Sequence, residues 1–260
     1  NNGGKRPMGK KYKNTSRRHS DHEAQTVHHL FGDQRDQHDW DPLDVYENGR
    51  RDQSYVKNVR PRSEGQKDLM EAIAKHSLVL AIGPAGTGKT YLAISAAVEA
   101  FEKGKVDRII LARPAVEAGE KIGFLPGDLQ DKLAPYLRPL YDALNDRIGV
   151  KRLKNLLETG EIEIAPIGYM RGRTLNNAFV VIDEAQNCTY SQIKMIVSRL
   201  GWNSTIVITG DPDQSDLLEG ISGLRDIARK LEKVEGIAVK YLRDTDIVRH
   251  PLVAKMLEVV

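Results

Sequence analysis

The residues with the clearest chemical signature form the segment GPAGTGKT, Gly83–Thr90. It fits the pattern G-x-x-x-x-G-K-[ST] and precedes a helix-like stretch, YLAISAAVEAF. In such a loop, backbone N–H groups converge on phosphate oxygens, the lysine reaches the β and γ phosphates, and the hydroxyl serves Mg²⁺. The pattern predicts a nucleoside triphosphate site in which Lys89 is catalytic and Thr90 is a metal ligand. The residues expected to contact the nucleotide are Gly83, Pro84, Ala85, Gly86, Thr87, Gly88, Lys89, Thr90 and Tyr91.

Two neighbouring carboxylates, Asp183 and Glu184, follow an apolar run in the segment VVIDEAQN. A carboxylate at the end of a core strand can hold the Mg²⁺ shell through water, and the next carboxylate can polarise the attacking water. We therefore expect Asp183 to serve the metal and Glu184 to serve catalysis.

A third polar strand end occurs in IVITGDPDQSDL, where an apolar run ends at Thr209 and Gln214 follows. Glutamine both donates and accepts hydrogen bonds, so Gln214 suits a catalytic role beside the γ phosphate, where it would distinguish ATP from ADP. Together the three strand ends predict nucleotide hydrolysis rather than passive binding. Phosphate transfer to a small acceptor is disfavoured, because a kinase would do better without a water-activating Glu184.

The elements that must position these residues are short apolar runs separated by helical segments, from about residue 61 onward. The runs are too continuous in apolar or β-branched residues to be half exposed, which predicts an α/β fold with a parallel, helix-covered sheet. Strands are expected at Leu78–Ile82, Arg108–Ala112, Glu161–Pro166, Ala178–Asp183, Thr205–Thr209 and Ile237–Leu242. Helices are expected at Glu64–Lys75, Lys89–Lys103, Gly127–Ile148, Val150–Thr159, Thr189–Leu200, Gly223–Leu231 and from Pro251 to the end.

Residues 1–60 have a different composition and are expected to form an irregular polar N-terminal arm before one principal domain at 61–260. They show no sustained apolar period, so they cannot bury enough surface to offset the entropy of ordering. The stretch 1–20 carries seven basic residues and no acid, whereas 21–47 carries eight acids against Arg35.

The composition excludes several classes of protein. No run approaches the roughly 18 apolar residues of a membrane span, and the first residues lack the apolar stretch of a secretory signal, so we expect a cytoplasmic protein without membrane contact. The single cysteine, Cys188, cannot form an internal disulfide. We interpret it as an inert, buried side chain.

Six segments together resemble the PhoH family of P-loop ATPases, relatives of the superfamily 1 helicases. They occur in order, at family-like spacing, from about residue 61 to the end. The resemblance implies a RecA-like core, dependence on ATP and Mg²⁺, helicase-like action on an RNA or DNA substrate, and an association with phosphate starvation. The segments are GPAGTGKT, ARPAVEAGEKIGFLPGDL (Ala112–Leu129), APIGYMRGRTL (Ala165–Leu175), VVIDEAQN, TGDPDQ (Thr209–Gln214) and DIVRHPLV (Asp246–Val253).

The resemblance also gives a role to a glutamine that precedes the first strand. Superfamily 1 motors use a glutamine at that place to read the adenine edge, and Gln66 in RSEGQKDL matches it. The alternative is an ordinary exposed glutamine on a helix.

Two loops that follow strands are expected at the carboxyl edge of the sheet, where ligands bind in such folds. The first offers Arg113 and Lys121, and the second offers Tyr169, Arg171 and Arg173. Basic groups would hold the phosphates of RNA or single-stranded DNA, and the tyrosine would stack a base. The alternative for Arg113 is a charge network that shapes the ATP site. For the other two arginines, nucleic acid or a subunit contact remains open.

Residues 61–260 carry 27 basic and 27 acidic residues, so nucleic-acid binding is expected to be weak or confined to a pore. This balance keeps a second class of function open. In that class the chain is an ATP-driven regulatory or assembly factor that acts on protein partners.

Superfamily 1 helicases bring an arginine from a second RecA-like domain to the γ phosphate. Only 46 residues follow Gln214, too few for another such core, so the charge is expected from a short C-terminal element or from another copy of the chain. The best candidate is Arg249 in DTDIVRHPL; the alternative is a surface arginine or a salt bridge within the chain. We expect a head-to-tail homo-oligomer, closed as a ring hexamer.

Overall fold

The computed structural model describes residues 59–114, 129–218, 220–248 and Met256, and in the first turns of the helix from Leu129 it describes side chains only from Tyr136 onward. The expected irregular arm, Lys121, Arg249 and the helix expected from Pro251 lie outside these residues, apart from Val59, Arg60 and Met256.

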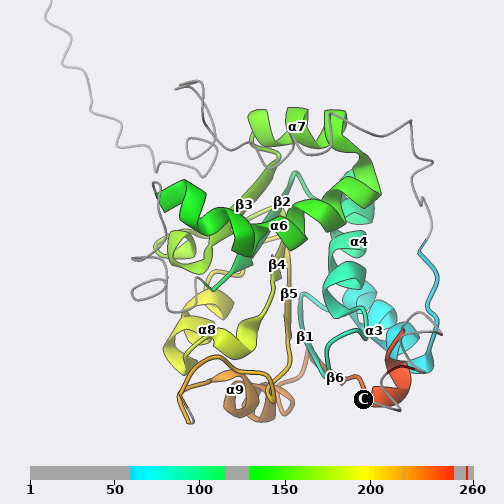
Figure 1. The fold of residues 1–260 in the computed structure, drawn as a ribbon, viewed down its shortest axis with the longest axis vertical. Helices are drawn as coiled ribbons and strands as arrows, with labels where there is room; N and C mark the ends of the chain where they lie inside the picture. The colour runs from blue at the N-terminus through cyan, green and yellow to red at the C-terminus, as the bar shows by residue number, and fades with distance from the viewer. Residues whose placement is uncertain (1–58, 115–128, 219, 249–255, 257–260) are drawn as a thin grey trace, which may run out of the picture.

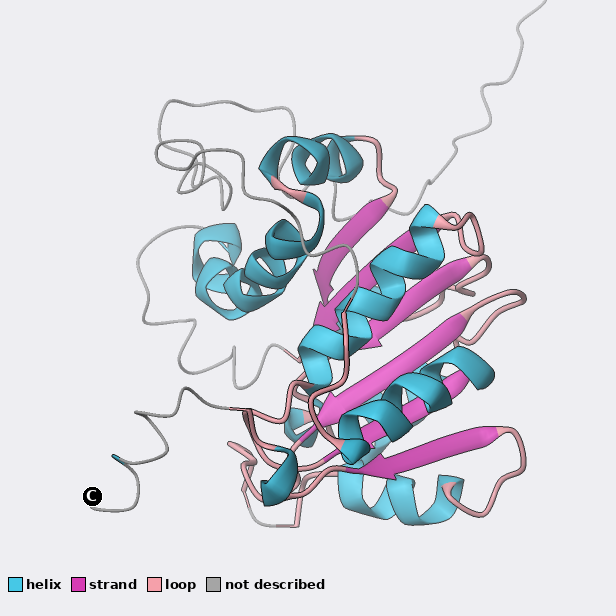
Figure 2. Cartoon of the chain, turned by 90° about the vertical axis from the view of Figure 1, so that its right-hand side faces the viewer, coloured by secondary structure: helices cyan, strands magenta, loops and turns pink. Residues whose placement is uncertain are grey.

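The described part of the chain contains a six-stranded sheet in the order β3-β2-β4-β5-β1-β6, and all its pairings are parallel. This confirms the expected α/β fold, and each strand agrees with its expected bounds within one residue. Figure 2 shows the strand ends gathered at one edge of the sheet. The strands are β1 Leu78–Ile82, β2 Arg108–Arg113, β3 Ile162–Pro166, β4 Ala178–Ile182, β5 Thr205–Gly210 and β6 Ile237–Tyr241.

Helices cover both faces of the sheet, which is why the inner strands are buried along almost their whole length. Helices α3, α4, α6 and α7 lie over one face, and α8 and α9 lie over the other (Figure 1). Alternate residues of one strand therefore join different cores: Val181 packs in the first core and Val180 in the second. The helices are α3 Glu64–Lys75, α4 Lys89–Glu102, α6 Leu129–Ile148, α7 Val150–Glu158, α8 Tyr190–Val197 and α9 Leu224–Leu231.

The strand order decides which strand ends can share a site. Strand β5 lies between β1 and β4, and β4 lies between β5 and β2. The carboxyl ends of these four strands are therefore contiguous at one edge, which is where ligands bind in open parallel sheets.

Three short helices were not predicted from the sequence: η1 Ile167–Met170, η2 Ala185–Asn187 and η3 Asp244–Asp246. Turns of this length leave no hydrophobic period to detect. The helix expected to run to Leu200 ends at Val197, and the chain then enters an isolated bridge between Leu175 and Leu200. None of the helices in the described ranges could cross a membrane.

The segment after β6 is fastened to the start of α3 by the buried carboxylate of Asp246. Oδ1 accepts from Gly65 N at 3.2 Å, and Oδ2 accepts from Arg243 N at 2.9 Å. The Ser63 hydroxyl and these backbone groups hold the pKa of Asp246 below its ordinary value. Ser63 also caps α3, since its Oγ accepts from Gln66 N at 3.1 Å.

This contact predicts a pH-dependent contribution to folding stability. A carboxylate with a lowered pKa in the folded state stabilises the fold above its unfolded pKa, and the contribution disappears as the pH falls through the folded pKa. Asp246→Asn should therefore lower the melting temperature at pH 7, and the difference from the wild type should shrink below about pH 4. Thermal melts from pH 7 to pH 3 would test this, with the exposed Asp226→Asn as the control. A constant difference across that range would contradict the assignment.

Candidate functional site

The loop between β1 and α4 has the backbone that a phosphate-binding loop needs. Gly83, Gly86 and Gly88 have φ values of 148°, 80° and 82°, in the region that favours glycine. A Cβ at Gly83 would lie 2.4 Å from the Leu242 carbonyl oxygen, so the start of the loop also requires a hydrogen in place of a side chain. The loop therefore leads its N–H groups into the N-terminus of α4, as anion binding requires.

The side chain of Lys89 lies back across this loop. Its Nζ donates to the carbonyl oxygens of Gly83 at 2.6 Å and Pro84 at 2.8 Å, and the residue is only 8% exposed. Burial lowers the pKa of Lys89, and the acids of the neighbouring strand ends, Asp211 foremost, oppose this shift. A poorly hydrated ammonium group among loop carbonyls can exchange these partners for phosphate oxygens.

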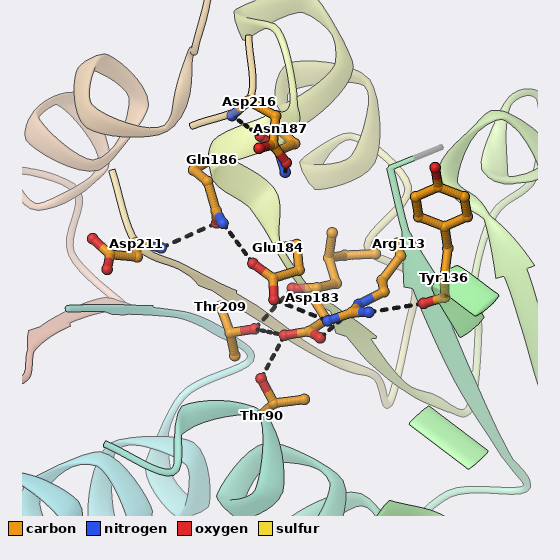
Figure 3. Close-up of polar contacts among 11 residues, drawn as sticks. Thr90, Arg113, Tyr136, Asp183, Glu184, Gln186, Asn187, Thr209, Asp211 and Asp216 are labelled. Atoms are coloured by element: carbon orange, nitrogen blue, oxygen red, sulfur yellow. Dashed lines mark hydrogen bonds and ion pairs between the residues drawn. The ribbon is translucent and has the colours of Figure 1, made fainter. Parts of the chain in front are cut away.

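The carboxylate of Asp183 joins the loop to the neighbouring strand ends (Figure 3). Its Oδ1 accepts from Thr90 Oγ1 at 2.5 Å and from Thr209 Oγ1 at 2.6 Å. The hydroxyl and carboxylate predicted as metal ligands therefore meet. Both are hard oxygen donors, and Mg²⁺ commonly binds to one or two such groups while phosphates and water complete its shell, so the pair fits this ion.

Glu184 occupies a less regular position than Asp183. It has left-handed backbone angles, φ 56° and ψ 40°, and its side chain is 43% exposed. Oε1 accepts from Arg113 Nη2 at 2.9 Å, and Oε2 accepts from Gln186 Nε2 at 2.5 Å. The carboxylate is thus held by two side chains at the edge of the site, where water can reach it.

Gln186, for which the sequence indicated no role, is a buried amide that connects two strand ends. While Nε2 holds Glu184, Oε1 accepts from Asp211 N at 3.0 Å, directly after β5. Gly210 allows this approach, because a Cβ there would lie 2.9 Å from Gln186 Oε1. The partners are 25 positions apart, so local spacing carried no signal for the contact.

The two glutamines predicted to contact the nucleotide lie in different environments. Gln66 is 5% exposed; its Nε2 donates to Thr87 O at 2.9 Å, and its Oε1 accepts from Arg62 N at 2.8 Å. This rules out the exposed-glutamine alternative, and adenine recognition stays a prediction. Gln214 is exposed in the turn after β5, and its role at the γ phosphate also stays a prediction.

The candidate nucleic-acid residues separate in space. Tyr169 is 37% exposed and Arg171 is exposed, beside the end of β3. Arg173 forms a two-pronged ion pair with Glu163, at 2.5 and 2.7 Å. Arg113, at the end of β2, pairs with Asp183 and Glu184 in a charge network at the candidate nucleotide site, and its contact with nucleic acid stays a prediction.

Two further predictions concern Cys188 and Arg249. Burial raises the pKa of Cys188 to about 12, and its side chain is fully buried, which agrees with an inert thiol. Arg249 lies outside the described residues. The residue before it, Val248, donates its N–H to Gly86 O at 3.0 Å, so the chain reaches the phosphate loop at that point.

Comparisons with known proteins give strong sequence matches. Residues 58–260 match the family described as PhoH-like protein. A PhoH-like protein of Bacillus subtilis (strain 168) is 54% identical over 203 residues, 78% of this chain and 64% of the relative. Protein PhoH of Escherichia coli (strain K12) is 43% identical over 210 residues, 80% of this chain and 59% of the relative. The chain thus spans less than two thirds of the length of these relatives.

Similarity to solved structures is more distant. A Pif1 helicase from Candida albicans is 15% identical, with a TM-score of 0.42, over 77% of this chain and 43% of that one. The SWI2/SNF2 ATPase core of Sulfolobus solfataricus, in complex with double-stranded DNA, is 18% identical, with a TM-score of 0.40, over 71% and 44%.

Proposed function

The chain belongs to the family of PhoH-like proteins, and we propose that it hydrolyses ATP with Mg²⁺ and couples hydrolysis to binding or remodelling of RNA or single-stranded DNA. One observation carries the hydrolytic part: the hydroxyl of Thr90 and the carboxylate of Asp183 meet at 2.5 Å, with Glu184 next in the chain. This arrangement supports the proposal, because two oxygen donors suited to a metal lie together at the phosphate-binding loop, with a candidate base next to them.

Each residue of the site has a separate task in this proposal. The bound Mg²⁺–ATP supplies a γ phosphoryl group that water attacks, giving ADP and phosphate. Lys89 exchanges its loop carbonyls for β and γ oxygens, while Thr90 and Asp183 hold the ion. Glu184 orients the water and accepts its proton. Gln214 reads the γ phosphate from the adjacent strand end.

A basic strip beside the ATP site supports the nucleic-acid part. The segments 165–175 and 185–204 contain no acid and hold four basic residues. They adjoin in space, because η1 packs on α8 and Arg199 Nη1 donates to Arg173 O at 3.3 Å. The balanced charge of the domain as a whole therefore conceals a local positive surface. The four basic residues are Arg171, Arg173, Lys194 and Arg199.

This strip borders a shallow pocket of about 420 Å³ at the ends of β2 and β3. Its walls are largely apolar, and an exposed tyrosine faces it, an arrangement that suits the flat face of a base with its phosphate on the basic strip. Such contacts would not depend on nucleotide sequence. The lining residues are Pro114, Pro166, Ile167, Gly168, Tyr169 and Gln192.

We propose further that the chain assembles as a head-to-tail ring hexamer in which Arg249 completes a neighbouring site. The bond from Val248 N to Gly86 O brings the chain to the phosphate loop of its own site directly before Arg249, which supports a role for this arginine at a γ phosphate; the mixing experiment below decides whether it serves its own site or a neighbour's. An arginine at that point would stabilise the charge that develops in the transition state.

The first prediction separates binding from catalysis in the ATP site. Lys89→Ala removes contacts to phosphate, so the Kd for ATP should rise at least about tenfold, which corresponds to 1.4 kcal/mol. Glu184→Gln keeps the shape but removes the base, so ATP should bind normally while kcat falls about 10²- to 10⁴-fold. Fluorescent-nucleotide titration and phosphate release measure the two effects, with the exposed Lys75→Ala as the control. Equal ATP affinity in the two variants would argue against these roles.

The second prediction concerns the basic strip. Tyr169→Ala should weaken binding of single-stranded RNA by about 1–3 kcal/mol, the usual contribution of one stacked base. Arg171→Ala should also reduce the slope of log K against log salt by about 0.7, since one phosphate contact is lost. Basal ATP hydrolysis should stay unchanged in both variants.

Filter retention at several salt concentrations would measure these effects. Tyr241→Ala and Arg229→Ala are matched controls on the far edge of the sheet and on α9. Retention equal to that of the wild type would remove the strip from the binding surface. Stimulation of phosphate release by RNA, compared with single-stranded DNA, would identify the preferred strand.

The third prediction tests Arg249 with two inactive proteins. If Arg249 acts across a subunit interface, mixing Lys89→Ala with Arg249→Ala will create some sites with an intact loop and an intact arginine. Phosphate release should then reappear, and mass photometry should show hexamers. If subunit exchange is confirmed but activity does not recover, Arg249 does not act on a neighbouring site. Full activity of Arg249→Ala alone would exclude the residue from catalysis.

A further inference from the structure

Arg113, the last residue of β2, bonds in three directions from one guanidinium group. Its Nε donates to Asp183 Oδ2 and its Nη2 to Glu184 Oε1, both at 2.9 Å. Its Nη1 donates to the carbonyl oxygen of Tyr136 at 2.7 Å. The side chain of Arg113 is 15% exposed, so its bond to the buried Asp183 is an interior contact, whereas its bond to Glu184 lies at the edge that water reaches. Figure 3 shows the group between the two carboxylates and Tyr136.

The two carboxylates depend on this arginine to different degrees. Asp183 is 3% exposed at its side chain and also accepts from two hydroxyls, so several contacts fix it. Glu184 has a left-handed backbone, which costs free energy for a residue with a Cβ. Its carboxylate is set by Arg113 and Gln186. Loss of Arg113 would remove one of these two contacts.

The third contact of Arg113 ties it to α6, which is not part of the phosphate loop. Tyr136 lies within α6, and Pro139 follows three residues later. Proline has no N–H, so this turn of the helix lacks one internal hydrogen bond. The N–H that Pro139 lacks would have bonded to the carbonyl of Pro135, so Arg113 does not replace that bond; it adds a contact to the next carbonyl, that of Tyr136, in the same turn.

We infer that Arg113 is a positioning residue that couples this turn of α6 to the orientation of Glu184. The inference rests on the proposed hydrolysis and adds its regulation: a partner that displaces α6 changes the position of the base without touching the nucleotide. Only arginine suits the position, since its planar fork donates in three fixed directions, whereas a lysine ammonium is a point charge. Because one guanidinium group bonds to both, a shift of the α6 turn at Tyr136 also shifts the carboxylate of Glu184, and the reverse holds as well.

The kinetic test compares Arg113→Ala and Arg113→Lys with the wild type at saturating Mg²⁺. A displaced base should lower kcat on the order of 10²-fold for Arg113→Ala. The Kd for ATP should stay within about threefold of the wild-type value, well short of the tenfold that 1.4 kcal/mol would give. Arg113→Lys should recover only part of the rate, because one ammonium cannot serve both carboxylates and the carbonyl.

A double variant shows whether Arg113 acts through Glu184. In the Glu184→Gln background, Arg113→Ala should have little further effect on the residual rate, because two residues that act as a unit are not additive. If the fold-losses in kcat of the two single variants multiply in the double variant, the inference is overturned. An equal loss of ATP affinity and kcat would also overturn it, since that result indicates a binding or folding role.

Hydrogen exchange tests the coupling without any turnover. Amides of the α6 turn after Tyr136 and amides of η2 should both exchange faster in Arg113→Ala. The control is Arg152→Ala, which removes the ion pair between Arg152 and Glu102 at the far end of α4, and it should change neither segment. Unchanged exchange in the α6 turn would overturn the coupling even if kcat falls.

The two tests separate this inference from the proposed function. A wild-type protein that releases no phosphate from Mg²⁺–ATP would sink the proposed hydrolysis, while the exchange pattern would still decide whether Arg113 connects α6 with η2. If Arg113→Ala fails to fold in circular dichroism melts, Arg113→Lys carries both measurements. In that variant, wild-type kcat together with wild-type exchange would refute the need for the fork.

Discussion

The site is organised around one buried negative charge, the carboxylate of Asp183. A carboxylate that is almost inaccessible to water is tolerated only when hydrogen bonds and an opposite charge replace its hydration. The donors are Thr90 after β1, Thr209 in β5 and Arg113 at the end of β2. Satisfying this charge therefore draws together the first turn of α4 and the ends of β2 and β5 around the residue that directly follows β4.

The next residue in the chain has the opposite character. Glu184 is partly exposed, lies in a strained backbone region and is held by Arg113 from β2 and by Gln186, two positions further along its own segment. A rigid carboxylate beside an adjustable one matches the two roles proposed for them. A metal site gains from fixed geometry, whereas a base whose position responds to neighbouring elements allows a partner to control hydrolysis.

Binding of nucleic acid, as proposed, depends on the location of the basic residues on the domain rather than on the net charge of the domain. Acidic and basic residues balance over residues 61–260. The segments that form η1, α8 and their flanking loops, however, contain basic residues and no acidic ones. Glu163 partly offsets this by pairing with Arg173. A small positive surface beside the ATP site is consistent with a strand held weakly and locally, so that release can follow each hydrolytic cycle.

The features that local patterns encode can be predicted from the amino-acid sequence alone. The local pattern of apolar residues predicts where the strands and helices lie. The glycines of the segment from Gly83 to Thr90, together with its Lys and Thr, predict the phosphate-binding loop. The residue types at Lys89, Asp183 and Glu184 likewise indicated their chemistry without any structure. The contacts of Arg113 with Asp183 and of Gln186 with Asp211 become visible only in the folded chain, because they join residues 70 and 25 positions apart. Such contacts arise from the order of strands in the packed sheet, where β4 lies between β2 and β5, and no local pattern specifies that order.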